Sequence, residues 1–130
     1  MTEEGLVKIS EFATRSDVSA DTVRYYERIG LLPRADRDGA GHRDYDADDL
    51  AWMAFLQRLR TTGMPIRDML RYAGLRAEGA ATLSARREIL FEHRKSVRAQ
   101  IAALRSALTA LDQKITTYDD MILSEGNADA

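Results

Sequence analysis

Residues 18–32 carry two well-marked helix ends and, between them, a polar face that could contact nucleic acid. Ser19 suits an N-cap because its hydroxyl can accept from a free backbone N–H of the first turn. Gly30 suits a helix end because glycine readily adopts a positive φ. Arg24 and Tyr25 fall on one face at helical spacing. Since an arginine can donate two hydrogen bonds to a base edge or a phosphate, this segment is a candidate for a helix that reads a DNA groove.

The neighbouring segments could support and flank such a helix. Its opposite face is apolar, with Val23, Tyr26 and Ile29 at helical spacing. Upstream, residues 10–15 predict a shorter helix, and two short helices joined by a tight turn form a candidate helix-turn-helix. Downstream, residues 34–46 surround an Asp-Gly-Ala-Gly turn and predict a small hairpin. A hairpin beside a recognition helix is called a wing.

Two further helices complete a head that we expect to span residues 6–75. Asp46, followed three residues later by Asp49, predicts a capping box, and Gly63 suits the end of that helix. Pro65 suits the first turn of the next helix, which is expected to end near Gly74. Residues 76–81 predict a hinge.

The segment 82–124 contains neither glycine nor proline and predicts one long helix. Its apolar residues follow a seven-residue repeat, which is typical of a coiled-coil seam. A single exposed helix of this length is marginal in water, so the seam needs a partner, most simply a second copy. The predicted dimerisation residues are Leu90, Val97, Ile101, Leu104, Leu108, Leu111, Ile115, Tyr118 and Ile122. Residues 125–130 are expected to be disordered.

The expected fold class is therefore mainly α, a winged helix-turn-helix head followed by a long coiled-coil dimerisation helix. The 130 residues include no cysteine, which excludes disulfides, thiolate metal sites and cysteine nucleophiles. His42 and His93 lie far apart, so we predict no metal and no cofactor. No motif places a catalytic pair, so no enzyme activity is expected. Without a signal peptide or an apolar run of about 18 residues, the expected location is the cytoplasm.

Two motifs carry a family resemblance. Residues 19–32 read Ser-x-x-Thr-x-Arg-Tyr-Tyr-Glu-x-x-Gly-Leu-Leu, and residues 41–45 read Gly-x-Arg-x-Tyr. With the order of elements around them, residues 7–124 resemble the MerR family of bacterial transcription regulators. The resemblance implies a homodimer joined by an antiparallel coiled coil on a pseudo-palindromic promoter. It further implies that an effector makes the dimer bend and untwist that DNA for RNA polymerase, the deformation costing several kcal/mol.

The resemblance also implies a set of DNA contacts. Arg24 matches a recognition-helix arginine, and Tyr26 is expected to keep its ring in the core with only its hydroxyl exposed. Asp21 stands where some relatives carry a basic residue and suits capping rather than base reading, while His42 stands where tyrosine is common. The implied DNA-binding residues are Ser19, Thr22, Arg24, Tyr25, Tyr26, Arg37, Arg43, Tyr45 and Arg60.

The segment 92–118 resembles the branch of the family that responds to aldehydes and electrophiles. Some of that branch use a cysteine in the third helix, where Arg58 stands here, so a thiol sensor is excluded and the effector stays open. Four aromatic residues could line an effector pocket between head and coiled coil, although simple core packing is the favoured interpretation. They are Trp52, Phe55, Tyr72 and Phe91.

Three functions remain open at this point. The first is an effector-responsive transcription regulator, and the second is an architectural or constitutive DNA-binding protein without a ligand. The third is a protein-interaction module that no longer binds DNA, which the net charge of −2 permits. Only the first two predict binding to DNA that weakens steeply with salt.

Overall fold

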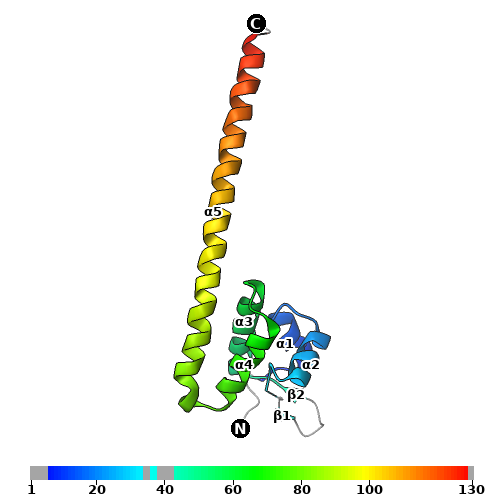
Figure 1. Ribbon diagram of the computed structural model, residues 1–130. Helices are drawn as coiled ribbons and strands as arrows, with labels where there is room; N and C mark the ends of the chain where they lie inside the picture. The colour runs from blue at the N-terminus through cyan, green and yellow to red at the C-terminus, as the bar shows by residue number, and fades with distance from the viewer. Residues whose placement is uncertain (1–5, 34–35, 38–42, 129–130) are drawn as a thin grey trace. The chain divides into compact units, whose positions relative to one another are not determined.

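The computed structural model describes residues 6–33, 36–37 and 43–128 (Figure 1). The chain divides into two compact units, Met1–Leu90 and Phe91–Ala130. The first unit thus continues past the predicted hinge at 76–81. The reason is that Ile89 is buried in the hydrophobic core of the head and Leu90 packs against that core.

The first two helices form the predicted helix-turn-helix. Helix α1, Ile9–Arg15, buries Phe12 and Ala13. Helix α2, Ala20–Ile29, is capped by Ser19, whose hydroxyl accepts from the backbone N–H of Thr22 at 3.0 Å, and it ends at Gly30 with φ +94°. Both predicted ends of α2 are confirmed.

A short ribbon follows α2, as predicted for the wing. Strand β1, Asp36–Arg37, pairs antiparallel with β2, Arg43–Asp44. The predicted turn at 38–41 and His42 lie outside the described residues. At the base of the ribbon, Val7 and Tyr45 exchange two backbone hydrogen bonds of 2.8 Å, which tie it to the segment before α1.

Helix α3, Ala47–Thr61, begins with the predicted capping box. The Asp46 carboxylate accepts from the Asp49 backbone N–H at 2.9 Å, and the Asp49 carboxylate accepts from the Asp46 backbone N–H at 2.9 Å. Helix α4, Ile66–Ala77, continues past Gly74, so the helix end predicted there is wrong. A glycine inside a helix costs only about 1 kcal/mol. Burial of Met69, Tyr72 and Ala73 on α4 offsets that cost, and the chain turns instead at Gly79, with φ +87°.

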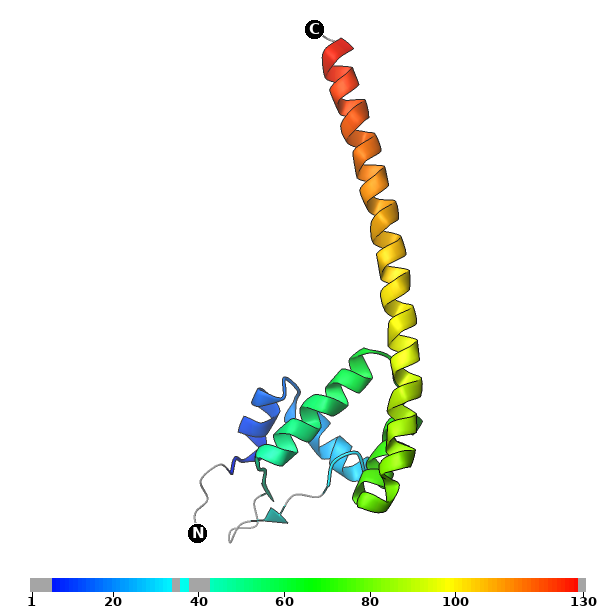
Figure 2. The same ribbon diagram turned by 90° about the vertical axis from the view of Figure 1, so that its left-hand side faces the viewer.

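A 3-10 turn, η1, Ala80–Thr82, leads into helix α5, Leu83–Ala128. Figure 2 shows α5 as one continuous helix. The disorder predicted for 125–130 is therefore wrong for residues 125–128, while 129–130 lie outside the described part. Adding a residue to an existing helix is far easier than starting one, so α5 continues through Gly126.

Candidate nucleic-acid interface

The exposed face of α2 presents the residues that the sequence singled out for DNA. Val23 and Tyr26 are buried on the opposite face, which fixes the orientation of the helix in the head. Arg24 is exposed, and its Nη1 donates to the Asp21 carboxylate at 2.9 Å. The Tyr25 side chain is 44% exposed, and the Arg28 guanidinium lies over its ring at 5.3 Å. This face therefore offers an arginine and an aromatic ring, both already held by neighbours.

The first turn of α2 uses both of its hydroxyl side chains within the head. The Ser19 hydroxyl caps the helix and also lies 3.0 Å from the Thr22 hydroxyl. Capping accounts for the serine at position 19, because its hydroxyl satisfies a backbone donor that the helix leaves free. The contacts to DNA predicted for Ser19 and Thr22 remain predictions.

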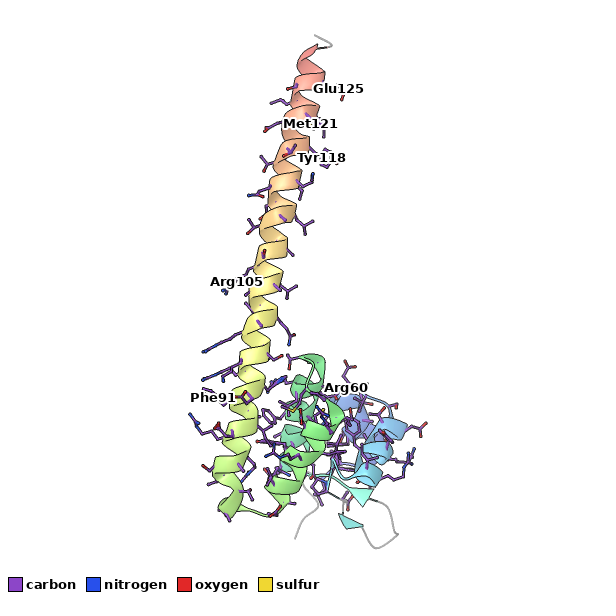
Figure 3. All side chains as sticks on the ribbon, viewed as in Figure 1. Arg60, Phe91, Arg105, Tyr118, Met121 and Glu125 are labelled. Atoms are coloured by element: carbon purple, nitrogen blue, oxygen red, sulfur yellow. The ribbon has the colours of Figure 1, made fainter. Side chains whose placement is uncertain are left out.

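Arg60 of α3, labelled in Figure 3, is joined to α2 through Tyr26. The Tyr26 ring is only 3% exposed. Its hydroxyl accepts from Nη1 of Arg60 at 3.0 Å and donates to Oε1 of Gln57 at 3.5 Å. The structure thus brings together two predicted DNA residues that are 34 positions apart in the chain.

Tyr45 lies differently from its prediction as a phosphate contact of the wing. Its side chain is 1% exposed, and its ring stacks on Phe12 with 4.2 Å between ring centroids. Its hydroxyl donates to the Glu27 carboxylate at 3.1 Å. We therefore correct its role: Tyr45 is a core residue that joins the wing to α1 and α2. A strand-end tyrosine next to an apolar helix face was the available signal for that role.

The basic residues of the wing are placed by their backbone alone. Arg37 and Arg43 face each other in the β1–β2 register, so the ribbon carries them on paired positions. Their predicted phosphate contacts concern side chains outside the described part of the structure. An ion pair between Lys8 and Asp44, which was not predicted from the sequence, joins the start of α1 to the ribbon.

One carboxyl near the start of α3 has a shifted pKa. Burial raises the pKa of the Asp49 carboxyl above its ordinary value of 3.8. The hydrogen bond from the Asp46 backbone lowers this pKa, and the negative charge of the Asp46 side chain raises it. The capping box thus brings two carboxylates together at a partly buried helix start, which is the cause of the raised pKa of Asp49.

The predicted dimer seam lies on α5. Leu90 packs against the core of the head, so its assignment to the seam is corrected. In the second unit the large apolar side chains from Ile101 to Leu123 are exposed, between 41% and 70%. Figure 3 shows two of them, Tyr118 and Met121, standing off the helix. This stripe gives α5 an apolar face that its own unit does not cover.

Three of the four predicted effector residues meet in the head. The rings of Trp52, Phe55 and Tyr72 lie 5.8 to 6.3 Å apart between centroids, from helices α3 and α4. The indole N–H of Trp52 donates to the backbone carbonyl of Leu31, just after α2, at 2.8 Å. Phe91, the fourth residue, belongs to the second unit, where Arg94 lies over its ring at 4.9 Å.

Two family models match the chain: the MerR HTH family regulatory protein over residues 7–73 and the MerR DNA-binding region over residues 50–114. The first covers α1, α2, the ribbon and α3, and so includes the exposed Arg24 face. The chain belongs to the MerR family. It is a DNA-binding transcription regulator and not an enzyme. Regulators of the MerR family bind promoter DNA, typically as dimers.

Named relatives agree with this assignment. The chain is 38% identical to the transcriptional regulator AdhR of Bacillus subtilis over 68% of its own length and 64% of that protein. A MerR family regulator structure from Listeria monocytogenes is 42% identical, with a TM-score of 0.82 over 87% of this chain and 86% of that one. The structure of HiNmlR, described as a MerR family regulator lacking the sensor domain and bound to promoter DNA, is 34% identical. Its TM-score is 0.80, over 88% of this chain and 91% of that one.

No helix in ranges 6–33 and 43–128 is long and apolar enough to cross a membrane. Within the same ranges, no group of three or more His, Cys, Asp or Glu side chains is placed to hold a metal ion.

Proposed function

We propose that two copies of this MerR regulator bind a pseudo-palindromic promoter and control transcription by deforming the DNA. The observation that carries the proposal is the exposed Arg24 and Tyr25 face of α2, on a helix whose other face is buried in the head. The similarity to a regulator described as bound to promoter DNA supports the same surface. In this arrangement Arg24 reaches base edges in the major groove, and Arg60 and the wing contact the flanking backbone.

The apolar stripe of α5 supports the dimer. Leu104, Leu108 and Leu111 are each more than half exposed, at the four- and three-residue spacing of a coiled-coil seam. A second copy would cover this stripe with an identical one. Two joined heads would then meet two half-sites, and a pseudo-palindromic site matches the two-fold symmetry of such a dimer.

The regulatory step follows from the cost of bending DNA. Deforming a promoter costs several kcal/mol, so a dimer that stabilises the deformed form changes how RNA polymerase engages the promoter. A small effector that favours one dimer shape would switch this step. Both RNA polymerase and the effector are proposed partners of this chain, and we keep the cytoplasm as its proposed location.

A second candidate is a regulator that works without a small-molecule ligand. The structure of HiNmlR, described as lacking the sensor domain, matches 88% of this chain and is itself matched over 91% of its length. The two candidates separate in a transcription assay on the same promoter. A ligand-dependent change in transcript level supports the first, and an unchanged level with every ligand supports the second.

Binding to DNA is the first test. Fluorescence anisotropy should show tight binding to the DNA upstream of the chain's own gene, weaker binding to an unrelated duplex, and a steep loss of affinity with salt. Arg24→Ala should weaken operator binding by about 1–3 kcal/mol and relax sequence preference. Arg105→Ala, on the exposed surface of α5, is the matched control and should bind like the parent. Unchanged operator affinity in Arg24→Ala would contradict the assignment of α2.

A further inference from the structure

We propose that a pocket in the head binds a planar organic anion, such as an aromatic carboxylate. The pocket has a volume of about 420 Å³ and lies between α3, α4 and the start of α5. Every residue around it belongs to the first compact unit. Its lining residues are Asp48, Ala51, Trp52, Phe55, Tyr72, Arg76 and Arg86.

The aromatic part of the pocket favours a flat ligand. The rings of Trp52 and Tyr72 are stacked with 16° between their planes, and Phe55 is tilted against both. Pockets for small organic ligands are commonly apolar and aromatic, hold a few convergent polar groups, and have volumes of about 300–1,000 Å³. The lining and the volume of this pocket meet these criteria, and the pocket is open to solvent.

The charges favour an anion. The Arg76 guanidinium lies 4.1 Å above the Trp52 ring, and the described residues provide no carboxylate in ion-pair contact with it. Arg86 is fixed by hydrogen bonds from Nε to the Thr82 hydroxyl at 3.0 Å and from Nη2 to the Gly79 carbonyl at 3.1 Å. Its Nη1 is not used in either bond. The lining therefore carries two guanidiniums against the single carboxylate of Asp48, and guanidiniums suit the geometry of a carboxylate ligand.

The pocket is connected to the DNA-reading helix. Trp52 forms one wall, and its indole N–H donates to the carbonyl of Leu31, which directly follows α2. Leu31 in turn donates its backbone N–H to the Tyr26 carbonyl of α2 at 2.8 Å. A ligand that moves the Trp52 ring would move the end of α2. This regulatory consequence rests on the proposed function, whereas ligand binding itself does not.

The direct test uses Trp52, the only tryptophan of the chain, as a reporter. Its indole N–H gives a single cross-peak in a ¹H–¹⁵N NMR spectrum of the full-length protein. Titration with benzoate, 2-naphthoate and indole-3-acetate should shift this cross-peak saturably with at least one of them. The matching neutral amides should shift it little, because they lack the charge that the guanidiniums recognise. Failure of all three anions, or equal binding of anion and amide, would overturn the proposal.

Two variants assign the effect to the pocket. Arg76→Gln should weaken binding of the anion about tenfold or more, since a hydrogen bond to a charged group is lost. Arg71→Gln makes the same change on α4 outside the pocket and should bind like the parent. Equal affinity in Arg76→Gln and Arg71→Gln would contradict the site. The titrations contain no DNA. A failure of the protein to bind its operator would therefore refute the proposed function and leave the measured anion binding unaffected.

Discussion

The Tyr26 hydroxyl couples α2 to Arg60 through a hydrogen bond of 3.0 Å. If Arg60 contacts a phosphate, this bond holds its side chain in place. Tyr26→Phe and Arg60→Ala should then each weaken operator binding, and the double variant should lose less than the sum of the two. We expect a coupling free energy of about 0.5 kcal/mol or more in a double-mutant cycle measured by anisotropy.

The salt dependence of binding gives an independent check on Arg60. Losing one phosphate contact should reduce the steepness of the slope of log affinity against log salt concentration by about 1.

Arg58, two residues away on α3, provides the control for the double-mutant cycle: the affinity losses of Tyr26→Phe and Arg58→Ala should be additive. Additive losses for Tyr26→Phe and Arg60→Ala would show that the Tyr26 hydroxyl does not act on DNA binding through Arg60.

The raised pKa of Asp49 makes the stability of the head depend on pH. Because burial raises this pKa above 3.8, the folded state binds a proton at Asp49 more readily than the unfolded state. The stability that proton binding at Asp49 adds to the folded head is therefore fully present below pH 3.8. It is lost as the pH rises through the raised pKa of the folded state. Asp49→Asn, which can still accept from the Asp46 backbone, should be at least as stable as the parent at pH 7. Thermal unfolding at several pH values should show this advantage shrinking towards pH 4.

The exposed Asp112 of α5 provides a carboxylate control for that series. Asp112→Asn removes the same charge without touching the capping box, so its stability relative to the parent should not follow the Asp49→Asn pattern. A parent protein that gains no stability relative to Asp49→Asn on acidification would refute the link between burial and the pKa of Asp49.

At the level of elements, Tyr45 anchors the ribbon to the helix-turn-helix. Tyr45→Phe keeps the stacking on Phe12 and loses the hydroxyl bond to Glu27, so it should cost about 0.5–1.5 kcal/mol of stability. Tyr45→Ala removes a buried ring and should cost about 3–5 kcal/mol. Urea denaturation measures both. Tyr45→Phe should also keep the parent's operator affinity under conditions where it is folded. A tenfold loss of operator affinity would instead support the phosphate contact predicted from the sequence.

The helices of the head could be predicted because their ends carry local chemical signals. Ser19, Gly30 and the Asp46–Asp49 pair act within one turn of the chain, so their roles can be read from neighbouring residues. The helix end predicted at Gly74 was wrong for the same reason. A glycine is a local signal of a helix end, whereas α4 continues past Gly74 because tertiary packing buries Met69, Tyr72 and Ala73.

The sequence predicted which way residues of the candidate site face better than it predicted which of them contact one another. The exposed position of Arg24 and the inward ring of Tyr26 follow from helical spacing alone. By contrast, the bonds from Tyr45 to Glu27 and from Arg60 to Tyr26 join residues 18 and 34 positions apart. Such pairs depend on how the ribbon and α3 pack on α2, which no local pattern encodes. Leu90 was misassigned because the heptad pattern continues into the part of α5 that packs on the head.

For the whole molecule, the apolar stripe of α5 predicts the oligomeric state. Leu108→Lys places a charge in the middle of the seam, where a second copy would leave it without a partner, so the dimer should dissociate. Sedimentation velocity should then show a folded monomer with much weaker operator binding. Ser106→Lys adds the same charge on the opposite face of the helix and should remain dimeric. A Leu108→Lys protein that sediments as a folded dimer would refute the coiled-coil assignment.

The exposed stripe on α5 also makes the behaviour of the regulator depend on how much of it is produced. A helix of 46 residues is about 69 Å long, so a lone copy exposes many apolar side chains to water. If a second copy covers them, the paired fraction rises with total abundance, and pairing stabilises the folded chain by mass action. At low abundance, unpaired chains are the ones that proteases and aggregation remove. Gene dosage would therefore help to set the concentration at which regulation begins.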